Sequence, residues 1–71
     1  MELFILKTNV RSLTMKEELA LQLDGIPQII TWSVDYQDCD GVLRASVAGI
    51  CIDELIGVVK KSGFECEELN D

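Results

Sequence analysis

The chain contains 71 residues, enough for one domain spanning 1–71, and its formal net charge is −7 because thirteen acidic residues outnumber six basic ones. This charge excludes a broad basic face for nucleic acid and a surface that docks on anionic membranes. Histidine is absent, which removes the usual general base of an enzyme and the most common metal ligand.

The first half of the chain predicts a strand, a helix and a second strand. Residues 2–8 alternate between two faces, and residues 14–24 place apolar side chains at spacings of three and four. Gly25 and Pro27 end that helix. Residues 29–36 alternate again and predict a strand. The expected inward-facing residues are Phe4, Leu6 and Thr8, then Met15, Leu19, Leu23 and Ile26, and then Ile30, Trp32, Val34 and Tyr36.

The second half predicts a hairpin, a helix and a last strand. Residues 37–41 form a turn that contains the hairpin dipeptide Asp-Gly, and residues 42–48 return as a strand. A helix is expected over 52–62, with lysines in its last turn and Gly63 beyond its end. Residues 64–69 predict a short strand. The expected inward-facing residues are Leu43, Ala45 and Val47, followed by Ile52, Leu55, Ile56 and Val59.

The order of these elements is β-α-β-β-α-β. With right-handed crossovers, that order predicts an α+β domain of ferredoxin-like architecture, in which a four-stranded antiparallel sheet has two helices on one face. Leu3 and Ile5 then point away from the helices. We interpret this small apolar patch as incidental rather than as a dimer surface.

Three segments resemble the heavy-metal-associated domain of copper chaperones and metal-pumping ATPases. "KTNV" (7–10) is similar to the first strand end and metal loop of that family, and "ITWSVD" (30–35) is similar to its second strand. "VVKKSGFECE" (58–67) looks like its second helix, closing loop and last strand. The likeness extends over nearly the whole chain. It implies the ferredoxin-like fold and a relationship to carriers of Cu(I) or Zn(II).

The Cys-x-x-Cys motif of that family is missing from the first loop. Alignment on Val10 and the helix start places the two cysteine positions at Ser12 and Met15. Two thiolates are soft, charged donors, whereas a serine hydroxyl is hard and stays protonated and a methionine thioether is neutral. We therefore expect a degenerate metal site with weak or no binding, and no resident cofactor. Cu(I) and Zn(II) are the metals that the resemblance implies.

The same loop has a local structural interpretation. Thr14 and Glu17 fit the S/T-x-x-E capping box at a helix start. Glu17 and Glu18 would then occupy the first turn, where the helix dipole favours anions. We expect Thr14 to cap the helix and Met15 to begin its apolar stripe.

The three cysteines form an odd set without paired spacing, which predicts free thiols in a reducing compartment. Cys39, at the predicted hairpin tip, is a further candidate metal ligand if the tip approaches Met15; the simpler interpretation is an exposed turn cysteine. Cys51, at the start of the second helix, is expected to serve packing or helix capping, and Cys66 is expected to pack in the core. No apolar run is long enough to span a bilayer and no signal peptide is expected, so we predict a cytoplasmic protein.

Four basic residues gather toward the first-loop end of the domain, namely Arg11, Lys16, Lys60 and Lys61. In the resembled family this end is the docking face, so a basic rim here would steer an acidic-surfaced partner or a metal-transporter domain. The simpler interpretation is that helix-end lysines complement helix dipoles.

Two functions stay open at this point. The first is a non-enzymatic relative of heavy-metal carriers with a degenerate metal site and a residual docking role. The second is an interaction or regulatory module of ferredoxin-like fold with no connection to metals. An enzyme resembling acylphosphatases is disfavoured, because Asn9 and Arg11 lie on a loop without glycine and no histidine is present.

Overall fold

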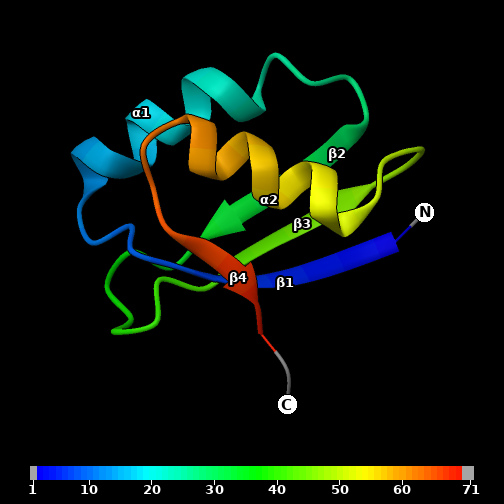
Figure 1. The fold of residues 1–71 in the computed structure, drawn as a ribbon. Helices are drawn as coiled ribbons and strands as arrows, with labels where there is room; N and C mark the ends of the chain where they lie inside the picture. The colour runs from blue at the N-terminus through cyan, green and yellow to red at the C-terminus, as the bar shows by residue number, and fades with distance from the viewer. Residues whose placement is uncertain (1, 70–71) are drawn as a thin grey trace.

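The computed structural model describes residues 2–69, in which one sheet is covered on a single face by two helices (Figure 1). The element order β-α-β-β-α-β confirms the predicted fold. The elements are β1 (Glu2–Thr8), α1 (Leu13–Leu23), β2 (Ile29–Val34), β3 (Leu43–Val47), α2 (Ile52–Lys61) and β4 (Cys66–Glu68).

The sheet has the strand order β2-β3-β1-β4, and all neighbouring strands are antiparallel. β1 and β3 are therefore central, and β2 and β4 are the edges. Phe4 pairs with Ala45 across β1 and β3, and Thr8 pairs with Cys66 across β1 and β4. This register places the end of β1 beside the last strand, where the first loop leaves the sheet.

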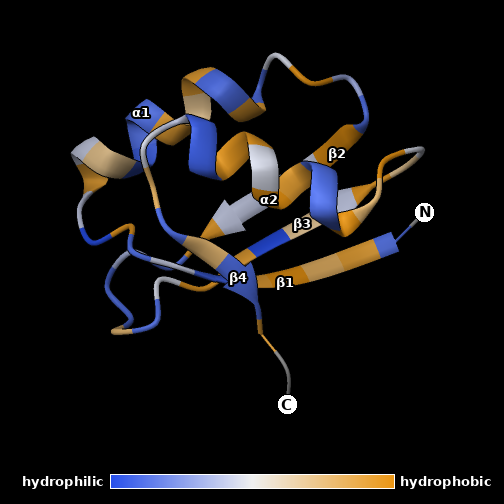
Figure 2. Cartoon of the chain, viewed as in Figure 1, coloured by the Kyte–Doolittle hydropathy of each residue, from blue (hydrophilic) through white to orange (hydrophobic). Residues whose placement is uncertain are grey.

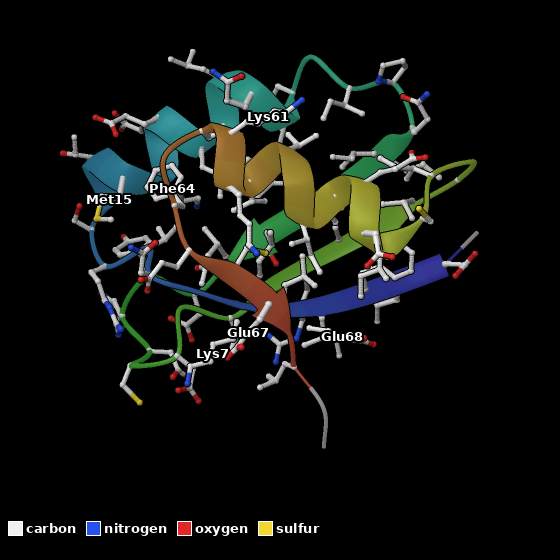
Figure 3. The ribbon with its side chains drawn as sticks, in the orientation of Figure 1. Lys7, Met15, Lys61, Phe64, Glu67 and Glu68 are labelled. Atoms are coloured by element: carbon white, nitrogen blue, oxygen red, sulfur yellow. The ribbon has the colours of Figure 1, made fainter. Side chains whose placement is uncertain are left out.

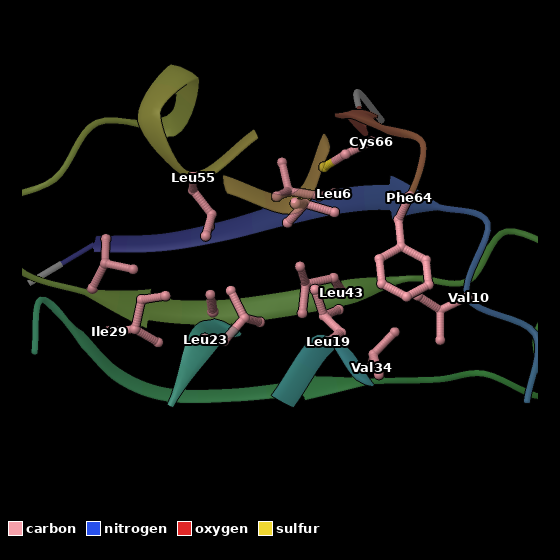
Figure 4. Close-up of a cluster of buried hydrophobic side chains, with 13 residues drawn as sticks. Leu6, Val10, Leu19, Leu23, Ile29, Val34, Leu43, Leu55, Phe64 and Cys66 are labelled. Atoms are coloured by element: carbon pink, nitrogen blue, oxygen red, sulfur yellow. The ribbon is translucent and has the colours of Figure 1, made fainter. Parts of the chain in front are cut away.

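The core lies between the helices and the covered face of the sheet (Figure 4). Leu6 and Leu43 from the sheet meet Leu19 and Leu55 from the helices, and all four are fully buried. Burying one leucine side chain contributes about 1.5–3 kcal/mol. Both helices alternate between hydrophobic and hydrophilic segments (Figure 2), as expected of helices with one face on a core.

The apolar stripe predicted for α1 is confirmed. Leu19 and Leu23 are buried, while Met15 and Ile26 pack partly against the core. The end of this helix is tied to the sheet by a side-chain hydrogen bond, because Trp32 donates its indole N–H to a carboxylate oxygen of Asp24 over 2.9 Å.

β2 starts at residue 29 as predicted, but the prediction that Ile30 faces the core was wrong. Ile29 is 9% exposed and pairs with Val47, whereas Ile30 is 52% exposed. The register shifts between Ile29 and Thr31, so an extra residue interrupts the ladder as a β-bulge. A bulge inverts the alternation of faces, and this reverses the expected places of the two isoleucines.

Two strands are shorter than predicted, because side chains take the backbone hydrogen bonds at the end of β2 and before the start of β4. β2 stops at Val34, since the Asp35 carboxylate accepts hydrogen bonds from the backbone of Gln37 and Asp38 and begins the turn. β4 begins only at Cys66, since the backbone N–H of Glu65 donates to the Asn9 side chain instead of to a strand.

Helix α2 has the ends that its sequence predicts. Asp53 and Glu54 lie in its first turn and Lys60 and Lys61 in its last, so both ends complement the helix dipole. Gly63 follows with a φ of 96°, which a glycine adopts without steric cost. Within residues 2–69, neither helix has the length and apolar character needed to cross a membrane.

The face of the sheet opposite the helices is open, as expected. Leu3 is 63% exposed on this face, and Ile5 is half-buried. Isolated apolar residues of this kind are common on soluble domains.

The bulge in β2 gives a direct stability test. Ile29→Ala removes a buried side chain and should lower the free energy of unfolding by about 2–4 kcal/mol, whereas Ile30→Ala should change it by less than about 1 kcal/mol. Urea denaturation of the two variants makes the comparison. A larger loss for Ile30→Ala would mean that β2 alternates without a bulge.

Candidate functional site

Three connections meet at one end of the domain, which we call the loop end. They are the first loop (residues 9–12), the hairpin tip (residues 35–42) and the closing loop (residues 62–65). This convergence was predicted from the topology, and hydrogen bonds between the three segments confirm it.

Thr8 stands at the centre of the loop end. It is the one buried polar residue among those described, with 3% exposure. Its hydroxyl donates to the Gly41 carbonyl over 2.5 Å and accepts from the backbone N–H of Val10 over 3.2 Å. Its own N–H lies within hydrogen-bond distance of the Asp40 and Gly41 carbonyls. Thr8 therefore joins the end of β1 to both the first loop and the hairpin tip.

Gly41 permits this approach because it has no side chain. A Cβ atom at this position would lie 2.6 Å from the Thr8 carbonyl and 2.8 Å from its hydroxyl. The φ of Gly41 is 50°, in the left-handed region. The glycine of the Asp-Gly dipeptide thus allows both the positive φ of the turn and the close approach of Thr8.

Charged side chains reinforce the same junction. Arg11 donates from its guanidinium to the Cys39 carbonyl, and Lys7 lies 3.7 Å from an Asp40 carboxylate oxygen. The Lys16 ammonium lies 5.8 Å from the centre of the Tyr36 ring, within cation–π range. Each contact links β1, the first loop or α1 to the hairpin.

The closing loop is attached by one polar and one apolar contact. The Asn9 side-chain oxygen accepts the Glu65 backbone N–H over 2.9 Å. Val10 and Phe64 are both buried, in the same core cluster (Figure 4). The first loop is therefore held by the two segments that flank it.

The prediction that Thr14 caps α1 was wrong. The helix begins at Leu13, and its N-cap is Ser12, whose hydroxyl oxygen accepts from the Met15 backbone N–H over 3.2 Å. Thr14 lies inside the first turn, and neither Glu17 nor Glu18 belongs to that turn. Glu17 completes a capping-box pattern with Thr14, but Thr14 is already inside the helix, so the cap falls on Ser12.

Ser12 and Met15, the two positions where the resemblance places cysteines, are thus joined by a hydrogen bond at the start of α1. Ser12 is exposed, and Met15 is half-buried against the core. Figure 3 shows Met15 on the first turn of α1. Ser12 therefore caps the helix, and Met15 packs against the core.

The cysteines occupy three separate places. Cys39 is exposed on the hairpin tip, with its thiol 3.9 Å from an Asp40 carboxylate oxygen. Cys51 is exposed as the N-cap of α2, and its side chain makes no capping bond. Cys66 is 5% exposed, and burial raises the pKa of its thiol to about 11. Cys66 is therefore a protonated core residue at neutral pH.

Asp38, Cys39 and Asp40 bring potential ligand atoms within 4.8 Å of one another on the hairpin tip. The backbone N–H of Asp40 already donates to the Asp38 carboxylate, so part of this grouping is ordinary turn chemistry. That Cys39 is a metal ligand stays a prediction.

A groove of about 460 Å³ opens between the end of β1, the last turn of α2 and the entry to β4. Its charged and amide-bearing lining residues are Lys7, Asn9, Arg11, Lys60, Glu65 and Glu67. Only two of the four predicted docking residues, Arg11 and Lys60, line it. Lys16 lies over Tyr36 instead, and Lys61 lies on the opposite side of α2 from Lys7 and Glu67 (Figure 3).

The sequence placed Lys7, Thr8 and Asn9 at this end of the domain, but their contacts with the hairpin tip and the closing loop were not predicted. The alternation of β1 predicts Thr8 on the core face, but it does not indicate that the Thr8 hydroxyl donates to the hairpin tip. The Asp-Gly dipeptide was the available signal, because a glycine next to a turn often marks a close approach of two backbones.

No protein-family model matches the chain, and no curated protein matches its sequence significantly. Its structure is similar to that of the yeast copper transporter domain CCC2A, which was solved in the apo and Cu(I)-loaded states. The TM-score is 0.82 over 100% of this chain and 99% of that one, with 15% sequence identity. The chain has the fold of a heavy-metal-associated domain.

This heavy-metal-associated fold agrees with the resemblance found in the sequence. At 15% identity the likeness shows the fold, and many functions share a fold. The activity must therefore be argued from the loop end itself.

The capping assignment can be tested with two alanine variants. Ser12→Ala removes the hydroxyl that accepts the Met15 N–H and should lower the free energy of unfolding by about 1 kcal/mol. Thr14→Ala should change it by less than about 0.5 kcal/mol, because alanine suits an exposed helical position. Urea midpoints for both variants decide the point. A larger shift for Thr14→Ala would restore Thr14 as the cap.

Proposed function

We propose that this chain is a small, non-enzymatic relative of heavy-metal carriers whose metal loop has become a structural loop. In this proposal it binds Cu(I) or Zn(II) weakly or not at all, and its loop end docks a partner protein. The observation that supports this most directly is the hydrogen bond from the Met15 N–H to the Ser12 hydroxyl, which uses the first cysteine position as a helix cap.

The donor chemistry supports weak metal binding. Carriers of soft metals use thiolates because these donors are both polarisable and charged. Ser12 offers a protonated hydroxyl and Met15 a neutral thioether, so neither supplies the charge that holds Cu(I). Cys66 does not compensate, because its thiol is buried and its pKa is raised to about 11.

The composition of the chain supports a function without catalysis. Histidine is absent from the sequence, so the usual general base is missing. The two exposed thiols, Cys39 and Cys51, lie in the hairpin tip and at the start of α2, two different parts of the fold. Neither is paired with an activating cation in the hydrogen bonds that the described residues form.

Charge supports the docking role. The chain has a net charge of −7. Arg11 nevertheless contacts the hairpin tip, and Lys60 and Lys61 lie in the last turn of α2, next to the closing loop. A local positive region on an acidic protein orients an acidic-surfaced partner during encounter. The partner class we propose is such a protein, with a domain of a metal transporter as one example, in the cytoplasm.

Cu(I) titration of the reduced protein against a competing chelator tests the metal part of the proposal. Wild-type protein should bind weakly, through Cys39 at best. The double variant Ser12→Cys/Met15→Cys should create a tight site, because its two thiolates would stand on a loop of the same fold as the copper transporter domain. The variant loses the cap and part of the Met15 packing, together about 2–3 kcal/mol of stability.

Three variants serve as controls for this titration. Ser12→Cys and Met15→Cys alone provide one thiolate each and should bind far more weakly than the pair, and Cys39→Ser should remove the residual wild-type binding. Wild-type affinity equal to that of the double variant would mean that a metal site exists elsewhere. A folded double variant without any gain would favour an interaction module unrelated to metal carriers.

A further inference from the structure

The two edges of the sheet differ in how they are protected from pairing with another strand. β2 is six residues long, and its sequence, IITWSV, contains no charged residue and no proline. β4 has only three residues, and two of them are glutamates. Short length and charged side chains are the usual protection of an edge strand. β4 therefore has this protection, and β2 lacks it.

Backbone groups on the outer side of β2 are available for pairing. Beyond its bulge, β2 pairs with β3 without further shifts in register. The Asp35 N–H donates to the Val42 carbonyl, which makes these two residues a hydrogen-bonded pair. Such pairs alternate along an antiparallel ladder, so Ser33 also bonds toward β3, whereas the N–H and C=O groups of Trp32 and Val34 point outward. These outward groups can extend the sheet by one more strand.

Helix α1 places one basic and one acidic side chain beside this edge. Asp24 accepts a hydrogen bond from the indole N–H of Trp32 in β2. Lys16 lies over the ring of Tyr36, two residues past the end of β2. Among the described residues, the Lys16 ammonium has no carboxylate within 4.0 Å. Ala20 is four residues from both charged positions, so it lies between them on the same face of α1.

This arrangement is complementary to a second copy of itself. In a two-fold dimer, residue i of one copy contacts residue j of the other, and j contacts i. With the axis beside Ala20, Lys16 of each copy faces the partner's Asp24, so one dimer contains two ion pairs. The small alanine at the centre lets the two helices approach, because the distance between helix axes depends on the side chains at the contact.

The charge of the whole chain favours this edge over other surfaces for association. A net charge of −7 makes two copies repel each other in general. The uncharged strand β2, together with Lys16 and Asp24 of α1, is a neutral region. Two copies therefore approach with least repulsion along β2.

We infer that the chain forms a homodimer in which the β2 strands of two copies pair in antiparallel orientation and continue the sheet from one copy into the other. In this dimer Lys16 of each copy lies opposite the partner's Asp24. The inference goes beyond the docking role proposed above and uses a different surface, because Arg11, Lys60 and the groove lie outside the β2 edge.

Sedimentation velocity of the reduced protein from micromolar to millimolar concentration tests the inference. Wild-type protein should pass from monomer to dimer, and the Trp32 amide should exchange more slowly in the dimer. Ser33→Lys adds a charge at an exposed position of β2 and should raise the dimer dissociation constant by about tenfold, because like charges then meet across the two-fold axis. Gln22→Lys adds the same charge at an exposed position on the opposite side of α1 from Ala20 and should change it by less than about twofold.

Charge reversal in two variants tests the symmetric ion pairs. Lys16→Glu places acids opposite each other, and Asp24→Lys places bases opposite each other. Each variant alone should therefore have a dimer dissociation constant about tenfold above that of wild type. An equimolar mixture should associate more tightly than either variant alone, because one chain then supplies both acids and the other supplies both bases.

Several results would overturn the inference. They are a monomer at every concentration, equal weakening by Gln22→Lys and Ser33→Lys, or a mixture that associates no better than its two components. A dimer that Ser33→Lys leaves unchanged would use a different surface and would contradict pairing through β2. Association is measured without metal or another protein, so its failure is distinguishable from a failure of the metal and docking proposals.

Discussion

The loop end depends on the contact between Thr8 and Gly41. The Thr8 hydroxyl is buried and donates to the Gly41 carbonyl, and the missing side chain of Gly41 allows the two backbones to approach. A buried hydroxyl without a partner costs about 1–3 kcal/mol. Loss of this hydrogen bond while Thr8 stays buried would therefore lower the stability of the domain by that amount. The first loop, the hairpin tip and the groove all take their positions from it.

The same contact belongs to a set of interactions within the protein that order the first loop. Here Ser12 caps the helix, Val10 is buried, and Asn9 and Arg11 bind the two neighbouring loops through hydrogen bonds. These contacts within the protein therefore fix the first loop between the hairpin tip and the closing loop.

The sequence predicted the fold because its patterns are local and consistent. Alternation in β1 and β3 and the stripes of both helices pointed to one core. The predictions from sequence were incomplete or wrong where a contact between distant segments determines the structure. The bulge at Ile30 depends on pairing with Val47 and Ser46 of β3. The groove brings Arg11 and Lys60 together from opposite ends of the chain. At the cap, the S/T-x-x-E pattern indicated Thr14, whereas the helix begins at Leu13 and Ser12 is its cap.

The dependence on the Thr8–Gly41 contact is tested most directly by comparing the free energies of unfolding of two variants, Gly41→Ala and Gly49→Ala. Both glycines have positive φ, but a Cβ at Gly49 meets nothing within 4 Å. Gly49→Ala should therefore lower the free energy of unfolding only by the backbone strain that alanine introduces, about 1–2 kcal/mol. Gly41→Ala should lower the free energy of unfolding by at least about 2 kcal/mol more, because its Cβ displaces Thr8. The backbone amide of Val10 should then exchange faster with solvent. Equal losses for the two variants would contradict the account.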